Sequence, residues 1–245
     1  MYATHVWNKF AVHRSKIKFV FLLLALPGVS EGQLFKWARE HNSNYDDRKF
    51  SYGFVIGIHT SAYQVKYSKK FVTPALDTVS SIIPSFSLGF SLGFLVNYRL
   101  NEYWDLRLMP KAGFYNQTLH YYYTNAPSQV QLVETTVVEF PLIVKYRSMR
   151  RGNVRMYMLG GFTPGIEASG KNDVQSSPNS IGINKANLSM DLGMGFDFYF
   201  PLFKLSEELR FSRGLVNMLA PSTSVYAVPL SRLNTNTISV YFIFQ

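Results

Sequence analysis

Large apolar residues alternate with mostly small or polar residues along the segment Phe86–Leu100. A period of two residues predicts a β-strand, because successive side chains of a strand point to opposite faces. The segment Ala186–Phe200 repeats the pattern. Soluble sandwiches rarely need strands this long, whereas a membrane-spanning β-strand needs roughly 9 to 11 residues and meets lipid on one face only. The pattern therefore predicts a closed transmembrane barrel.

The alternation assigns a face to each side chain of these strands. The bulky apolar positions are expected to face lipid, and the small or charged positions are expected to face the barrel interior. The expected lipid-facing residues are Phe90, Leu92, Met194, Phe196, Phe242 and Phe244, and the expected interior residues are Ser91, Gly93, Asp191, Gly195 and Asp197.

Six further segments complete a prediction of eight strands, an even number, as in single-chain bacterial barrels. The expected strands are Phe50–Val65, Phe86–Leu100, Trp104–Leu119, Val133–Arg147, Val154–Ala168, Ala186–Phe200, Phe203–Leu215 and Thr235–Gln245. Their connections alternate between long and short, as in an up-and-down barrel. The predicted fold class is an all-β, eight-stranded, antiparallel, up-and-down transmembrane β-barrel. Because short turns usually face the periplasm, both ends of the mature chain are expected there.

The N-terminus predicts a secretory signal peptide over residues 1–32. Four basic residues precede the apolar run Phe19–Leu26, and small residues stand at Ser30 and Gly32, before a cleavage site at Gln33. A membrane anchor, the alternative, needs about 20 apolar residues. Removal takes four basic residues and Glu31, which lowers the net charge from +10 to +7. Residues 33–49 are expected to be a periplasmic lead-in, and residues 50–245 the outer-membrane barrel. The absence of cysteine excludes disulfides and thiolate chemistry.

Charged residues on inward phases predict an interior charge network. An eight-stranded barrel has room only for its own side chains, so these charges are expected to pair across strands. Arg99 is expected opposite Asp105, and Asp191 diagonal to Arg210. The network comprises Arg99, Asp105, Arg107, Lys111, Glu139, Lys145, Asp191, Asp197, Glu208 and Arg210. A mutually neutralising plug is the favoured interpretation, and a proton or ion path is the alternative.

Catalysis and metal binding find little support in the sequence. His59 and Ser61 are the only histidine–hydroxyl pair expected on one face of a strand, and no carboxylate is placed to orient the histidine. No histidine or carboxylate cluster has the spacing of metal ligands. The pair Asp46–Asp47 is interpreted as a solvated turn. We therefore expect no enzymatic activity, no catalytic residue, no metal and no cofactor.

Two surface features invite a binding hypothesis. A basic rim around the second short turn comprises Arg147, Arg150, Arg151 and Arg155. It is interpreted either as a grip for lipid phosphates or an acidic partner, or as a solvated turn. Glu207 lies between Leu205 and Leu209 on a lipid-facing phase. A carboxylate there indicates either a protein neighbour that covers it or a depth near the membrane interface.

Aromatic residues gather near both sets of connections, as in the two girdles of a membrane barrel. One group, with Tyr98, Trp104 and Tyr146, lies near the short turns, and another, with Tyr63 and Tyr121, lies near the long loops. Any β-protein is rich in such residues, so the girdles are supporting evidence only.

Four segments carry a resemblance to a known family. They are Asn44-Tyr-Asp-Asp-Arg-Lys-Phe-Ser-Tyr-Gly-Phe-Val-Ile-Gly-Ile58, Arg99-Leu-Asn-Glu-Tyr-Trp-Asp-Leu-Arg107, Val138-Glu-Phe-Pro-Leu-Ile-Val-Lys-Tyr146 and Gly193-Met-Gly-Phe-Asp-Phe-Tyr199. Over about residues 44–245 the chain resembles the PorT family, outer-membrane barrels of the Bacteroidota type IX secretion and gliding motility system. The last two segments are common to related porin-like barrels, whereas the first is typical of the PorT family.

The resemblance implies a non-enzymatic accessory of type IX export, which secretes proteins with a C-terminal sorting domain, and it supplies no active-site residue. The expected partners are outer-membrane lipid and other secretion-system components, and no nucleic acid. Two alternatives stay open: a general small barrel that stabilises the envelope or binds ligands through its loops, and a narrow ion channel.

Overall fold

The computed structural model describes residues 43–72, 79–124, 126–168, 181–220 and 226–245. The predicted signal peptide, residues 1–32, and most of the predicted lead-in lie outside the described residues. Within them the structure has two short 3-10 helices, η1 (Ser43–Asp47) and η2 (Lys69–Val72), and eleven strands. The strands are β1 (Phe50–Tyr67), β2 (Val79–Ser85), β3 (Ser87–Arg99), β4 (Trp104–Leu108), β5 (Lys111–Tyr123), β6 (Gln129–Glu139), β7 (Leu142–Arg147), β8 (Val154–Glu167), β9 (Ala186–Tyr199), β10 (Lys204–Gly214) and β11 (Leu230–Phe244).

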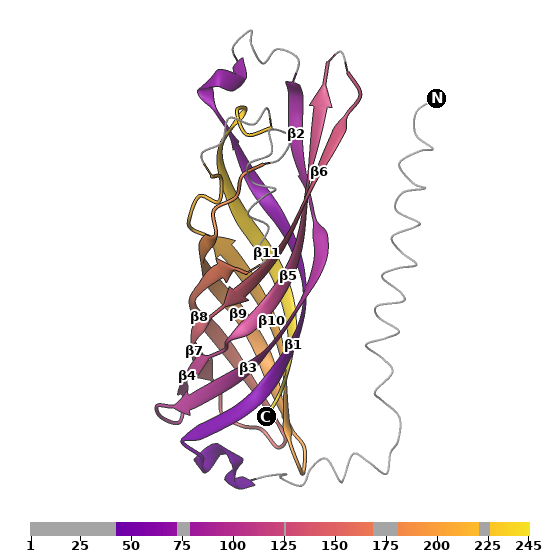
Figure 1. Cartoon of the computed structure of the whole chain (residues 1–245). Coiled ribbons are helices and arrows are strands. Elements are labelled where there is room, and N and C mark those ends of the chain that lie inside the picture. Colours follow the sequence, from indigo (N-terminus) through magenta and orange to yellow (C-terminus); the bar gives the residue numbers. More distant parts are fainter. Residues whose placement is uncertain (1–42, 73–78, 125, 169–180, 221–225) are drawn as a thin grey trace, which may run out of the picture. The chain divides into compact units, whose positions relative to one another are not determined.

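The strands form one antiparallel sheet that closes on itself (Figure 1). β1 pairs with β3 on one side and with β11 on the other, so the first and last strands meet. β8 pairs with β9, which continues the sheet through β10 to β11. The predicted all-β antiparallel barrel is therefore confirmed. No helix in the described ranges has the length and apolar character needed to cross a bilayer.

The strand count differs from the predicted eight because two expected strands are interrupted and because β2 lies in a segment expected to be a long connection. Pro110 separates β4 from β5, and Pro141 separates β6 from β7. A prolyl nitrogen cannot donate to the ladder, although the prolyl oxygens still accept from Phe94 N at 3.0 Å and Met109 N at 3.1 Å. The register of β3 runs unchanged across the first break. Each of these two pairs therefore follows the path of one strand.

A further interruption lies at Phe86, between β2 and β3. Ser85 pairs with Thr118 on β5, whereas Phe90 pairs with Phe114. The path from β2 to β3 thus has one more residue than β5 between these two pairs, which is the arrangement of a β-bulge. Counting each interrupted pair as one segment leaves eight segments around the sheet.

Several strands extend farther than expected at the end of the barrel that carries the long connections. β2, the end of β5, the beginning of β6 and the beginning of β11 all occupy residues expected to be loop. The inward side chains of β2, of the end of β5 and of the beginning of β11 include large apolar residues instead of small or charged ones. The contrast between lipid-facing and interior-facing residues is therefore weaker there. Packing of these side chains, described below, accounts for the extra length.

The expected faces agree with the exposure of the side chains. Phe90, Leu92, Met194 and Phe196 are between 43 and 49% exposed, and Phe242 and Phe244 are partly exposed. Ser91, Asp191 and Asp197 are at most 1% exposed. The outer surface is therefore an apolar band, as a lipid-facing wall requires.

The aromatic residues divide differently from the expected girdles. Near the short turns, Trp104 packs on Tyr146 at a centroid distance of 4.8 Å, and both rings are exposed. Near the long loops, however, Tyr63 and Tyr121 are 4% and 1% exposed and point inward. The second girdle is therefore wrong in part, because these rings belong to the interior packing.

Candidate functional site

Buried ion pairs fill the middle of the barrel. Arg107 Nη1 lies 2.8 Å from Glu208 Oε2, and Lys145 Nζ lies 2.7 Å from Asp197 Oδ2. These four side chains are at most 1% exposed. Buried charges are costly unless they are paired and hydrogen-bonded, and Ser206 Oγ adds a 2.5 Å hydrogen bond to Asp197. This part of the interior is therefore a packed polar core.

Arg210 links this core to the next layer of charges. Its Nε donates to Glu208 Oε1 at 3.0 Å, and its Nη1 lies 3.6 Å from Asp191 Oδ2. Lys111 forms an ion pair with Glu139. The ion-paired residues of these layers are four cations and four carboxylates, namely Arg107, Lys111, Lys145, Arg210, Asp191, Asp197, Glu139 and Glu208. Their formal charges cancel.

Tyrosine rings enclose the cations of this network. Lys145 Nζ lies 3.6 Å from the centroid of the Tyr157 ring, and Arg210 Cζ lies 4.6 Å from that of Tyr241. The Tyr157 hydroxyl also donates to Glu208 Oε2 at 3.1 Å. A ring face attracts a cation, and this attraction strengthens when water is excluded. The rings thus stabilise the cations and fill the space between them.

Arg99 and Asp105 face each other in the strand register, as expected, but their charges meet other partners. Arg99 Nη1 lies 4.0 Å from Asp47 Oδ1, and Asp105 Oδ2 lies 3.2 Å from Arg147 Nε. Two of the ten expected network residues therefore belong to the short-turn end of the barrel, where the chain enters β1, and not to the central layers.

A small polar cavity lies beside the charged layers. Its volume is about 50 Å³, and its lining includes Lys111, Glu139, Asp191 and Arg210 together with several hydroxyl groups. Since one water needs about 10 to 15 Å³ of such space, the cavity can hold a few waters.

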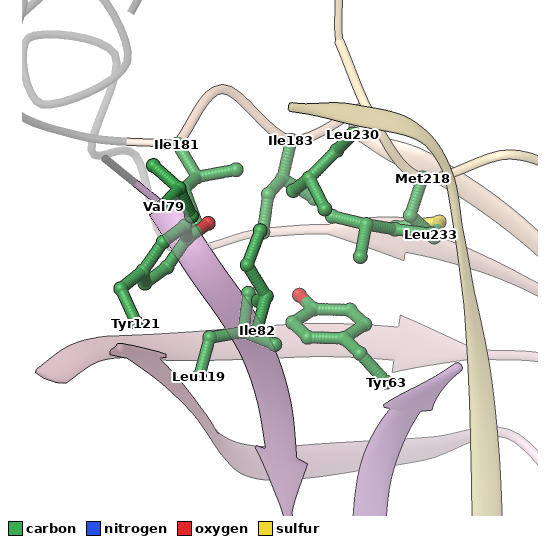
Figure 2. Packing of buried hydrophobic residues seen from close by; sticks show 10 residues of the cluster. All are labelled: Tyr63, Val79, Ile82, Leu119, Tyr121, Ile181, Ile183, Met218, Leu230 and Leu233. Atoms are coloured by element: carbon green, nitrogen blue, oxygen red, sulfur yellow. The ribbon is translucent and has the colours of Figure 1, made fainter. Parts of the chain in front are cut away.

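An apolar cap fills the barrel interior at the long-loop end. Figure 2 shows its ten buried side chains, which come from three strands of the wall, from β11 and from connecting segments. They are Tyr63, Val79, Ile82, Leu119, Tyr121, Ile181, Ile183, Met218, Leu230 and Leu233. Leu119 and Leu233 are fully buried. This packing gives the extended strands their inward partners.

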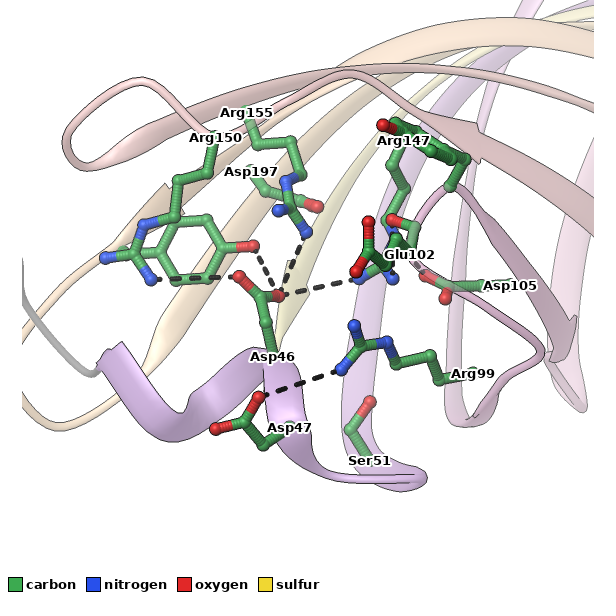
Figure 3. A network of polar contacts seen from close by, with 12 residues as sticks. Asp46, Asp47, Ser51, Arg99, Glu102, Asp105, Arg147, Arg150, Arg155 and Asp197 are labelled. Carbon is green, nitrogen blue, oxygen red and sulfur yellow. Dashed lines mark hydrogen bonds and ion pairs between the residues drawn. The ribbon is translucent and has the colours of Figure 1, made fainter.

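The short-turn end carries a cluster of three arginines around one carboxylate (Figure 3). Asp46 Oδ1 lies 3.1 Å from Arg155 Nη1 and 3.5 Å from Arg147 Nη1, and Asp46 Oδ2 lies 3.8 Å from Arg150 Nη1. The Tyr199 hydroxyl donates to Asp46 Oδ1 at 2.9 Å. We call these five residues the mouth cluster.

The mouth cluster changes the interpretation of the predicted basic rim. The side chains of Arg147, Arg150 and Arg155 are only 6, 7 and 11% exposed and turn toward Asp46 instead of toward lipid. Arg151 alone of the four is an exposed residue. Three of the four rim residues therefore lie in the barrel mouth, where they meet a carboxylate of the same chain.

Asp46 was expected in a solvated turn, and its neighbour Asp47 does have a side chain that is 80% exposed. Asp46 is 15% exposed because η1 turns it into the barrel mouth. Its partners lie about 100 to 150 residues away in the sequence, so strand periodicity gives no sign of them. An excess of arginine around one short turn was the only available signal that a carboxylate belonged there.

The side chains of the expected histidine–hydroxyl pair, His59 and Ser61, are buried in the barrel interior. His59 and Ser61 are each 1% exposed. The His59 ring lies 4.3 Å from the Tyr115 ring, centroid to centroid, and Ser61 Oγ donates to Asn116 O at 3.5 Å. The two side chains thus contact different parts of β5.

Glu207 lies on the outer surface, as its phase predicts. It is exposed on β10 and pairs with Phe196 on one side and with Phe242 on the other. Its neighbour Glu208 points inward and is 1% exposed. A carboxylate therefore interrupts the aromatic part of the apolar band.

The chain matches one family model and is similar to several solved structures. Residues 33–220 match the family model described as outer membrane protein beta-barrel domain. No protein with a curated description matches the chain significantly. Among the solved structures that show similarity are OprG from Pseudomonas aeruginosa (14% identity, TM-score 0.40, 78% of this chain and 93% of that chain), Neisserial surface protein A (13%, 0.36, 80% and 98%) and the outer membrane enzyme PagL (10%, 0.39, 77% and 97%).

Proposed function

Because this chain belongs to the outer-membrane β-barrel domain family, we propose that it is an accessory component of type IX protein secretion that acts through its surfaces and not through a pore or an active site. The filled interior is the observation that carries this proposal. Eight charges cancel in the central layers, and the apolar cap fills the long-loop end. The resemblance to the PorT family supplies the secretion system.

The proposal includes an orientation in the outer membrane. The short-turn end faces the periplasm and the long-loop end faces outward, as is usual for bacterial barrels. Both mature termini are then periplasmic. In this orientation the mouth cluster is within reach of other envelope proteins, and the apolar cap closes the external side.

The outer face around Glu207 is the proposed docking surface for another secretion component. An acidic side chain among Phe196 and Phe242 is poorly solvated by lipid tails, and charges on this face of a barrel destabilise it with increasing depth. A polar or basic side chain of a membrane-embedded neighbour would compensate that cost. This surface requires no movement of the barrel itself.

Deleting the gene and measuring sorting-domain proteins in the culture medium tests the proposed function. We expect export to fail, and to return when the wild-type gene is supplied. Undiminished export by the deletion strain would contradict the secretion role and favour a general envelope barrel. Stable single-channel currents from the purified protein would instead favour the ion-channel alternative.

Complementation with Glu207→Leu tests the docking surface separately. We expect the barrel to accumulate in the outer membrane at the wild-type level while export falls. The matched control is Leu209→Ala, because Leu209 is also outward-facing on β10 and is 52% exposed. Full export with Glu207→Leu would remove the docking surface and leave depth near the interface as the reason why the charge is tolerated.

A further inference from the structure

The segment before β1 contributes two adjacent side chains to the barrel mouth. Asp46 accepts hydrogen bonds from Arg147, Arg155 and the Tyr199 hydroxyl, and it forms an ion pair with Arg150. Tyr45 is 6% exposed, and its ring meets the Tyr199 ring edge-on at a centroid distance of 6.0 Å. Lys204 Nζ lies 4.7 Å from the centroid of the Tyr45 ring. An aromatic ring and a carboxylate thus bind side by side (Figure 3 shows the carboxylate).

The barrel holds this site in place by contacts that do not involve Asp46. Arg147 Nη2 donates to Asn101 O at 3.1 Å and to Glu102 O at 3.2 Å. Arg150 Nε donates to Gly152 O at 2.7 Å, and its Cζ lies 3.8 Å from the centroid of the Tyr199 ring. The short turns therefore fix the direction of the Arg147 and Arg150 guanidinium groups. A preorganised fork of donors binds carboxylates well.

Cations surround the ring and the carboxylate of the N-terminal segment. The three guanidinium groups of the mouth cluster lie within ion-pair distance of Asp46, and Lys204 lies over the Tyr45 ring. Clusters of arginine are a common means of recognising acidic peptide motifs. The arginines of the mouth cluster thus suit an acidic side chain at the position of Asp46, whether or not it belongs to the same chain.

We propose that the mouth of the barrel is a binding site for a peptide segment in which an aromatic residue precedes an acidic one. Tyr45–Asp46 occupies the site in cis, and a partner segment with the same two side chains takes their place when the N-terminal segment leaves. The inference goes beyond the proposed secretion role, and it holds for either orientation of the barrel.

The aromatic position selects a peptide over a free phosphate or a lipid headgroup. A phosphate can replace the carboxylate of Asp46, but it leaves the space of the Tyr45 ring empty. The Tyr45 hydroxyl is buried with no hydrogen-bond partner within the described ranges. The site therefore recognises the ring and not the hydroxyl, so phenylalanine should serve as well as tyrosine.

Fluorescence anisotropy with a labelled peptide tests the site in trans. The probe has the sequence of residues 43–48, Ser-Asn-Tyr-Asp-Asp-Arg, and the protein is the full mature chain in detergent micelles. We expect the Tyr45→Ala/Asp46→Ala variant to bind the probe at least tenfold more tightly than the wild type, because a tethered occupant competes at an effective concentration in the millimolar range. Asp47→Ala, with a side chain 80% exposed in the wild type, is the matched control and should behave as the wild type.

Changes in the probe test its chemistry. A peptide with Asp46→Ala should lose binding to the double variant, and a peptide with Tyr45→Phe should retain it. Failure of the folded double variant to bind the probe would overturn the proposal. Equal displacement of the probe by inorganic phosphate at the same concentration would also overturn it, because the aromatic position would then contribute nothing.

A measurement on the wild type covers the case in which the double variant does not fold. Amide hydrogen exchange of residues 43–48 should become faster when unlabelled probe is added at millimolar concentration, because the probe displaces the segment. Exchange in the strands should not change. Unchanged exchange of residues 43–48 at saturating probe would contradict the proposal.

Discussion

Glu207 and Glu208 are neighbours in the chain, but they face opposite environments. Glu207 is exposed between Phe196 and Phe242, whereas Glu208 accepts hydrogen bonds from Arg107, Arg210 and Tyr157 in the interior. The two positions differ by one step of the strand, so they provide matched variants with opposite expectations.

Glu208→Gln is expected to destabilise the barrel strongly. It leaves Arg107 and Arg210 without the carboxylate they share, and an uncompensated buried charge costs about 3 to 5 kcal/mol. Glu207→Gln should leave stability unchanged, and Glu207→Leu should leave it unchanged or raise it. Guanidinium unfolding in micelles, followed by tryptophan fluorescence, measures both. A larger loss for either Glu207 variant than for Glu208→Gln would show that the phase of β10 is wrong.

Periodicity predicts which way a side chain points, but it does not predict its ionic partner. All eight charges of the central layers have inward phases that can be recognised in the sequence. The partners of Arg99 and Asp105 could not be predicted, because a long guanidinium reaches past its opposite residue to another strand or to η1. The strand register determines which residues lie opposite each other, whereas the length of the side chains determines which charges form ion pairs.

At the scale of strands, small residues opposite rings help to fix the register. Gly57 on β1 lies opposite Tyr241 on β11, and a Cβ at Gly57 would lie 2.5 Å from the Tyr241 ring and from Ser91 Oγ. Gly195 on β9 has the same relation to Tyr157 on β8. Each glycine leaves the space that a neighbouring ring fills.

Gly57→Ala is therefore expected to destabilise the barrel by about 1 to 3 kcal/mol, the usual cost of overpacking. Gly160→Ala is the matched control, because the nearest atom to its added Cβ is at 3.4 Å. The cost of Gly57→Ala should shrink in a Tyr241→Ala background. Equal unfolding midpoints for the Gly57 and Gly160 variants would contradict the packing argument.

The apolar cap gives a second prediction for the strands. Leu233→Ala removes a fully buried side chain, so we expect a loss of about 2 to 5 kcal/mol. Leu132→Ala, at a position 57% exposed on β6, should cost far less in micelles. Similar losses for the two variants would show that the cap does not stabilise the barrel.

The strand ends show where sequence patterns stop being informative. The alternation of lipid-facing and interior-facing residues predicts the strands well toward the short-turn end of the barrel. At the long-loop end both faces of a strand can carry large residues, because Leu119 and Leu233 pack inside, and the contrast that marks a strand is lost. Interruptions at Pro110 and Pro141 follow from local chemistry, but only the paired register shows that the strand path continues beyond them.

At the scale of the whole molecule, the filled interior predicts that the barrel does not conduct ions. Reconstituted protein in a planar bilayer should show no stable open steps of porin size, since side chains occupy the interior of so small a barrel. A general porin of known conductance is the positive control. Reproducible ohmic steps of that size would contradict the neutral core and support a channel.

The barrel architecture could be predicted from the sequence because the same amphipathic strand pattern repeats along the chain. Closure into a barrel follows from the amphipathic strands. Their apolar faces are covered by lipid, so the sheet does not need a second protein layer. The mouth cluster does not repeat: it depends on one aspartate meeting Arg147, Arg155 and Tyr199 after the wall has formed. Such a contact can be recognised only in three dimensions.

The pairing of β1 with β11 also sets the order in which the chain can fold. Partners such as Phe54 and Phe244 are separated by nearly the whole barrel sequence, so this ladder cannot form until the last strand has been delivered. Contacts of such long sequence separation form slowly. Until then both β1 and the growing edge of the sheet expose unpaired backbone groups, which invite aggregation. Formation of β11 therefore completes the sheet and removes both exposed edges.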